Sequence, residues 1–157
     1  MTPKEYLQQA RHMRTRMDAL EERRQRYLDM ATKSTAHYRS GPGGTRRVSS
    51  VEEGAVKLAD LAEEMRIRSD IYAEALRGIE AAIDAVEPAL YRDVLKLRFL
   101  NGWYWERIGK SLHYTRQGVD NICRNALRRV RVPRDAEPVE DIVRRALREH
   151  RTPRAKE

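Results

Sequence analysis

Two long stretches repeat apolar side chains at alternating intervals of four and three residues, and this spacing constrains the fold more than any other feature. Such intervals place every member of the set on one face of an α-helix that packs against another helix. The first stretch predicts a helix over residues 3–33, with Thr2 as its N-cap and Glu5 three residues later. Its stripe comprises Tyr6, Ala10, Met13, Met17, Leu20, Arg24, Tyr27 and Ala31.

The second stretch predicts a longer helix that begins near residue 51 and is capped by Ser49 or Ser50. Its stripe comprises Val51, Ala55, Leu58, Ala62, Met65, Ser69, Tyr72, Leu76, Ile79, Ile83 and Val86, and a further apolar edge adds Val56, Ile71, Ala75 and Ala82. Residues 34–50 separate the two helices and contain Gly41, Pro42, Gly43 and Gly44, so we expect a flexible loop there. Residues 1–86 are therefore interpreted as an antiparallel, coiled-coil hairpin arm.

Opposite charges favour pairing of the two predicted helices. Residues 1–33 carry 8 basic and 5 acidic side chains, whereas residues 51–90 carry 4 basic and 10 acidic ones. The helices could pair within one chain, as a structural hairpin, or between chains, as a homodimer or partner-docking arm. The sequence leaves both alternatives open.

The composition argues against several classes of protein. A single cysteine allows no internal disulfide, and the four histidines lie too far apart in sequence to suggest a zinc site. No segment approaches the ~20 apolar residues of a membrane span, and no Gly-rich phosphate loop is present. No spacing groups Ser, His and Asp into a catalytic set. We expect a soluble, all-α protein that is not an enzyme and has no cofactor, no metal and no membrane partner.

Residues 87–132 fit a helix–turn–helix head. A helix over residues 88–100 should end at Asn101-Gly102, and two short helices should follow, the first over about residues 105–112. Thr115 is a suitable N-cap for the second. Gly109 is small where the helices cross, and Tyr114 is expected to fill the gap between them. The inward side of the second helix comprises Val119, Ile122, Cys123, Ala126, Leu127 and Val130.

The outward side of that second helix carries side chains that suit double-stranded DNA. Gln117, Asn121, Arg124 and Arg128 follow one another at intervals of four, three and four residues. Arg, Gln and Asn can form paired hydrogen bonds with base edges in the major groove. Residues 91–134 hold 11 basic and 3 acidic side chains, which favours a polyanionic partner. The predicted DNA-binding residues are Thr115, Arg116, Gln117, Asn121, Arg124, Arg107, Lys110 and Arg128.

This head resembles region four of bacterial sigma factors, and it is closer to phage late-transcription regulators of the ArpU and RinA type. Those proteins carry a run that reads roughly LRY-x-x-G-x-x-W-x-x-I-A, and the matching residues here are Leu97, Arg98, Phe99, Gly102, Trp105 and Ile108. The long helices and the Gly-rich loop before the head also look like this family, so the resemblance covers residues 5–132. His113 replaces the usual turn glycine, which implies a left-handed or nearby conformation for this residue. Gly109 replaces the common alanine, and Gly118 lies inside the reading helix.

The resemblance implies a regulator of phage or prophage late genes, which we expect in the cytoplasm of a bacterial host. Its helical hairpin would provide either assembly or contact with RNA polymerase. Two alternatives remain: a small DNA-packaging (terminase) subunit, and an adaptor that binds RNA polymerase without reading DNA itself. Residues 133–157 are interpreted as a linker and a short amphipathic tail helix. We expect the apolar face of that helix to fold back onto the body; this face comprises Val139, Ile142, Val143, Ala146 and Leu147.

Overall fold

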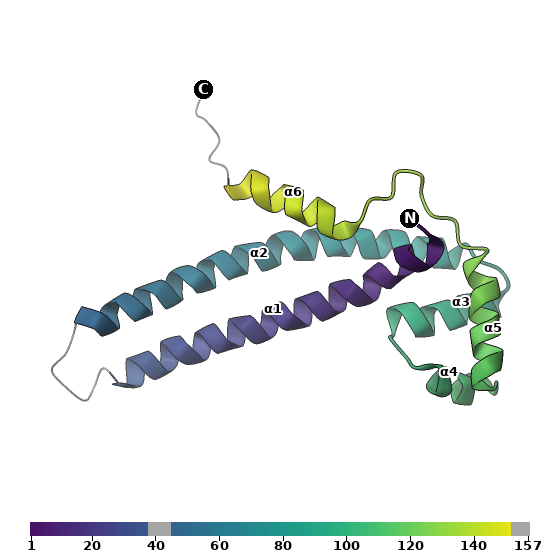
Figure 1. Cartoon of the computed structure of the whole chain (residues 1–157), viewed down its shortest axis with the longest axis horizontal. Helices are drawn as coiled ribbons and strands as arrows, with labels where there is room; N and C mark the ends of the chain where they lie inside the picture. The colour runs from purple at the N-terminus through teal and green to yellow at the C-terminus, as the bar shows by residue number, and fades with distance from the viewer. Residues whose placement is uncertain (38–44, 152–157) are drawn as a thin grey trace, which may run out of the picture. The chain divides into compact units, whose positions relative to one another are not determined.

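The computed structural model describes the backbone of residues 1–37 and 45–151, and the side chains of residues 1–32 and 51–151. This part of the chain is helical and contains no strand, which confirms the all-α class (Figure 1). Two long helices come first, and shorter ones follow. The elements are α1 (Pro3–His37), α2 (Thr45–Asp84), α3 (Ala89–Leu95), the π-helical turn η2 (Lys96–Leu100), α4 (Trp105–Leu112), α5 (Arg116–Leu127) and α6 (Val139–Arg151).

Contacts divide the chain into two compact units. Unit 1 combines Met1–Arg14 with Ile71–Glu157, and unit 2 is Thr15–Asp70. The start of α1 and the end of α2 therefore belong to the same unit as all the shorter helices. The division into 1–86, 87–132 and 133–157 follows the order of the chain and stays a prediction.

Unit 1 holds the largest fully buried side chains of the described residues. They come from the first turns of α1, the last turns of α2, the connection just after α2 and every shorter helix except η2, and they are Leu7, Ile79, Ile83, Val86, Val94, Leu95, Ile108, Val119 and Val143. Burying such side chains is the main favourable term in folding. The core of unit 1 thus joins residues from both ends of the sequence.

The predicted cap of α1 is confirmed. The backbone N–H of Thr2 donates to the Glu5 carboxylate at 2.7 Å, and the backbone N–H of Glu5 donates to the Thr2 hydroxyl at 3.2 Å. These reciprocal bonds satisfy two of the amide donors that a helix leaves unpaired at its N-terminus. They also lower the pKa of Glu5, chiefly through the Thr2 backbone N–H.

The long helices extend further than predicted. α1 continues to His37 and α2 already begins at Thr45, so the helical backbone includes residues 34–37 and 45–50 of the expected loop. Ser49 and Ser50 consequently lie inside α2, and the expectation that one of them caps it is wrong. The remaining part of the predicted flexible loop, residues 38–44, falls outside the described residues.

The buried face of α2 in unit 2 differs from the predicted stripe. Leu61 is 4% exposed and Arg68 8%, whereas the predicted members Ala55, Ala62 and Ser69 are exposed. Both faces share Leu58 and Met65, which are half-buried. The buried face has Leu61 where the predicted stripe has Ala62. The larger leucine side chain removes more apolar area from water.

Two contacts in unit 2 allow this face of α2 to be buried. Gly54 lies against α1, because a Cβ atom built on it would be 4.0 Å from the Cβ of Ala31. Arg68 is buried with its charge paired, because its Nε lies 3.0 Å from Oε1 of Glu64. Pairing offsets part of the cost of removing a guanidinium from water.

In unit 1 the predicted α2 stripe is largely confirmed. Tyr72, Ile79, Ile83 and Val86 are buried, and only Leu76 is exposed. The predicted helix from Pro88 to Leu100 is also present, although its second half is π-helical. It ends at Asn101, and Gly102 follows with φ +71°, a left-handed conformation that favours glycine.

The tail helix α6 packs against the rest of unit 1, as expected. Val139 and Val143 are buried, and Ile142, Ala146 and Leu147 are half-buried. Two polar contacts hold its first turn. The Val139 N–H donates to Oε1 of Gln9 at 2.8 Å, and the Tyr72 hydroxyl donates to the Glu140 carboxylate.

Candidate nucleic-acid interface

A three-residue turn joins α4 to α5. His113 has φ 61° and ψ 42°, which confirms the predicted left-handed conformation. Its backbone N–H and that of Tyr114 both donate to the carbonyl oxygen of Gly109, the latter at 2.8 Å. The end of α4 therefore closes on itself before α5 begins.

Gly109 and Thr115 permit the close approach of the two helices at this turn. A Cβ atom on Gly109 would lie 2.5 Å from the backbone oxygen of Tyr114, so only glycine fits there without a backbone shift. Thr115 confirms its predicted role, because its hydroxyl accepts a hydrogen bond from the Gly118 N–H at 3.0 Å. Both residues fix the direction in which α5 leaves the turn.

The expectation that the Tyr114 side chain fills the gap between the helices is wrong. Tyr114 is 44% exposed, and its Cδ1 would lie 3.7 Å from a Cβ atom on Gly118. The backbone oxygen of Tyr114, and not its ring, occupies the close approach at Gly109. Ile108 and Val119, both fully buried, take that place in the core.

The two sides of α5 differ as predicted. Val119, Cys123, Ala126 and the following Val130 are buried, while Ile122 and Leu127 are half-buried. Burial raises the pKa of Cys123 to about 11, so its thiol stays protonated at neutral pH and contributes to packing. α5 packs against α3 and α4, and its polar side is left to solvent.

All eight predicted DNA-binding residues are exposed. Gln117 and Asn121 are brought together, because Nε2 of Gln117 donates to Oδ1 of Asn121 at 3.3 Å. Two arginines are held by carboxylates: Arg116 lies 3.4 Å from Glu106, and Arg124 pairs with Asp120. Lys110 and Arg128 make no ion pair with another described residue.

Two arginines stack on tryptophan rings, and neither contact was predicted from the sequence. The guanidinium carbon of Arg107 lies 3.8 Å from the ring centre of Trp103, and that of Arg98 lies 4.3 Å from the ring centre of Trp105. Arg98 also donates to the Trp103 carbonyl at 3.0 Å. Trp103 precedes the first residue of α4, so helical spacing did not indicate the first stack. Stacking restrains Arg107 while leaving its charge exposed.

Neither a candidate metal site nor a candidate membrane span is present among the described residues. None of their His, Cys, Asp and Glu side chains form a group of three or more that could hold a metal ion. Among the helices of this part of the chain, none combines the length and apolarity needed to cross a membrane. Comparison of the chain with protein-family models, curated proteins and solved structures found no match.

Proposed function

We propose that this protein is a sequence-specific, DNA-binding transcription regulator in which α4 and α5 form a sigma region-four-like helix–turn–helix. The observation that carries the proposal is the two-sided character of α5. Its inner side is buried against α3 and α4, and its outer side presents Arg116, Gln117, Asn121 and Arg124 to solvent. A reading helix needs this division, because one side must be anchored while the other enters the major groove.

The amide pair on α5 is suited to reading a base. The hydrogen bond between Gln117 and Asn121 uses one donor of Gln117 and the oxygen of Asn121. It leaves the Gln117 Oε1 acceptor and the Asn121 Nδ2 donors available. Adenine offers one acceptor and one donor in the major groove, so this pair matches adenine.

The ion pairs of Arg116 and Arg124 contribute little free energy, so contacts with DNA can replace them. Arg116 and Arg124 are 70% and 65% exposed in their side chains, and exposed ion pairs contribute only about 0–1 kcal/mol each. A phosphate or guanine edge can therefore replace Glu106 or Asp120 at little cost. Without DNA, the carboxylates hold both guanidinium groups near the outer side of α5.

We also propose that the two long helices form an antiparallel, coiled-coil hairpin arm. Gly54 meets Ala31 in unit 2 and Gly78 meets Tyr6 in unit 1, which is the order of contacts that such a hairpin has. We assign this arm to assembly as a homodimer or to contact with bacterial RNA polymerase. The proposed setting, late-gene control in a phage or prophage, rests on the resemblance of the head.

The test compares a DNA site selected from random sequences with unselected DNA at one salt concentration. Gln117→Ala and Asn121→Ala should each weaken binding to the selected site by about 1–3 kcal/mol and change binding to random DNA little. Lys110→Ala should weaken both about equally. Lys57→Ala, an exposed lysine of α2, is the matched control and should change neither.

Three outcomes would contradict the proposal. Unchanged discrimination in both amide variants would show that α5 does not read DNA. Binding to RNA polymerase without any binding to DNA would favour the adaptor. A ring of about eight or more subunits in solution would favour a DNA-packaging subunit.

A further inference from the structure

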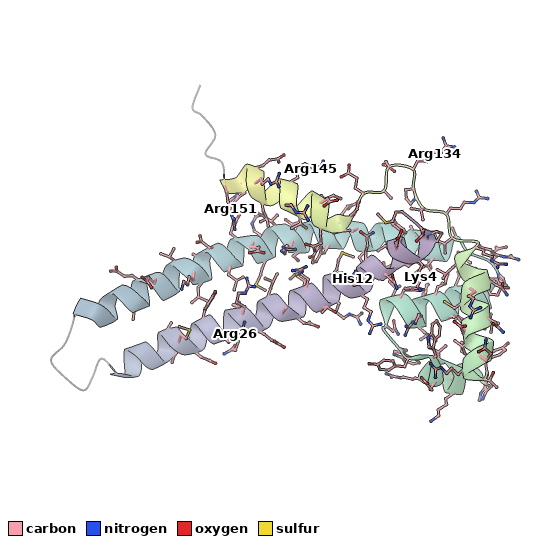
Figure 2. The ribbon with its side chains drawn as sticks, in the orientation of Figure 1. Lys4, His12, Arg26, Arg134, Arg145 and Arg151 are labelled. Carbon is pink, nitrogen blue, oxygen red and sulfur yellow. The ribbon has the colours of Figure 1, made fainter. Side chains whose placement is uncertain are left out.

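Unit 1 contains a cavity of about 360 Å³ that none of the residues proposed to read DNA lines. The start of α1, the end of α2, the connection before α6 and the first turns of α6 all contribute to it. Arg134 lies on that connection and Arg145 on α6, as Figure 2 shows. The apolar wall comprises Ile71, Ala75, Gly78, Pro133, Val139 and Ile142. The volume falls at the lower end of the range of small-molecule sites.

One polar group in this wall has no partner. Tyr6 is 7% exposed, yet its hydroxyl makes no hydrogen bond to any described residue. The hydroxyl lies against Gly78, where a Cβ atom would come within 3.0 Å of it. Burial and the nearby Asp135 carboxylate raise the pKa of Tyr6, so the phenol is protonated at neutral pH. No buried polar side-chain atom of the described residues lacks a partner, so the unpartnered Tyr6 hydroxyl is reached by solvent from the cavity. A ligand in the cavity can take the place of that solvent as its hydrogen-bond partner.

The charge around the cavity is negative. Two of its carboxylates are neutralised from outside, since Glu74 pairs with Arg77 and Glu137 pairs with Arg145. Asp135 makes no ion pair within the described part of the chain. None of the residues that line the cavity is basic. One uncompensated carboxylate and one unpartnered hydroxyl thus border an apolar space.

We propose that this cavity binds a small organic cation, namely a primary amine on a compact apolar body. The ammonium group donates to the Asp135 carboxylate and to the Tyr6 hydroxyl oxygen. The apolar body packs against Ile71, Val139 and Ile142. This site is separate from the proposed DNA-reading function and does not depend on it.

Three probes of similar shape test the proposal with the full-length protein: 2-phenylethylamine, 2-phenylethanol and 3-phenylpropionate. Each is titrated while the methyl signals of Ile71, Val139 and Ile142 are followed by NMR. We expect the amine to shift these signals with a Kd of ~1 mM or tighter. The neutral alcohol should bind several-fold more weakly, and the carboxylate should bind most weakly because Asp135 repels it.

Two variants separate the polar contacts from the apolar wall. Asp135→Asn should weaken binding of the amine about threefold, because an exposed ion pair contributes little more. Tyr6→Phe should weaken it about fivefold, because one hydrogen bond is lost. Asp93→Asn, which changes an exposed carboxylate outside the cavity, is the matched control and should leave the Kd unchanged. All three substitutions preserve the size of the side chain.

Several results would overturn the proposal. Equal affinities for the three probes would show that the cavity does not select ligands by charge. Equal affinities of the native protein and Asp135→Asn for the amine would show that Asp135 forms no ion pair with the ligand. Amine-induced shifts confined to residues outside the cavity would indicate surface attraction only. The absence of any shift at amine concentrations far above the expected Kd would also refute the site.

Discussion

Three residues determine the turn that positions α5, and each does so by a different physical means. Gly109 leaves room for the Tyr114 carbonyl, His113 adopts a left-handed conformation, and Thr115 caps the following helix. The roles of Gly109 and Thr115 were predicted from the sequence, because they depend on near neighbours in the chain, whereas the conformation of His113 was implied by the resemblance. Positive φ in a non-glycine residue is uncommon and costs conformational energy. His113 is exposed, and the two backbone hydrogen bonds from His113 and Tyr114 to the Gly109 carbonyl help to offset that cost.

Replacing Gly109 by alanine should destabilise the protein. The new Cβ atom would meet a backbone oxygen at 2.5 Å, and backbone cannot rotate away as a side chain can. We expect a loss of about 1–3 kcal/mol in the free energy of unfolding, although alanine is by itself the better helix former. Denaturant unfolding measures the loss. Ser111→Ala, at an exposed position of the same helix, should stay within ~0.5 kcal/mol; equal effects of the two variants would refute the steric argument.

The cap of α1 predicts a pH dependence. The hydrogen bonds from Thr2 hold the pKa of Glu5 below its ordinary value in the folded protein. Their contribution to stability is therefore present above the unfolded pKa of Glu5 and is lost as the pH falls through the lowered folded pKa. An NMR titration of the Glu5 carboxyl should give a lower pKa in the native protein than in concentrated urea. Equal values in both conditions would show that the capping box does not form in solution.

At the scale of elements, α2 shows why a repeat of four and three residues is not sufficient to identify a buried face. Two neighbouring faces of the helix satisfy the same spacing and share Leu58, Met65 and Tyr72. The choice between them depends on the partner helix, which offers a close approach to Gly54, and on Glu64, which neutralises Arg68. These contacts are not encoded in the spacing itself.

Substitutions in unit 2 should distinguish the two faces. Leu61→Ala should lower the free energy of unfolding by about 2–4 kcal/mol, because Leu61 is 4% exposed and its removal leaves a cavity. Ala62→Gln should change the stability by less than about 0.5 kcal/mol, because Ala62 is exposed. Both values come from denaturant unfolding of the full chain. A large loss in Ala62→Gln with none in Leu61→Ala would restore the predicted stripe.

Dependence on contacts with other elements also separates the parts of the candidate site that could be predicted from those that could not. The inner and outer sides of α5 follow from helical periodicity, so Val119, Cys123 and Asn121 were placed correctly. The exposure of Tyr114 could not be predicted, because it depends on the backbone approach at Gly109. The stack of Arg98 on Trp105 joins η2 to α4, and it requires the turn at Gly102 to be known first.

At the scale of the molecule, the uneven charge predicts the behaviour of the proposed DNA complex in salt. Residues 91–134 concentrate 11 basic side chains against 3 acidic ones. If they neutralise about four to six phosphates, the logarithm of the binding constant should fall against the logarithm of salt concentration with a slope near −4 to −5. A fluorescence binding assay at several salt concentrations measures the slope. Lys110→Ala should reduce its magnitude by about one unit, and a flat response would exclude DNA as the main ligand.

Unit 1 is closed by segments that lie more than fifty residues apart in the chain, and this has a consequence for biosynthesis. Tyr6 and Leu7 leave the ribosome long before their partners on α2, and Val139 and Val143 leave it later still. Residues 15–70 can pair while the nascent chain is still growing, whereas the start of α1 must wait with its apolar face exposed. A transcript broken after the codon for residue 132 would therefore yield a polypeptide with an uncovered apolar surface, and such surfaces are what proteolytic quality control recognises.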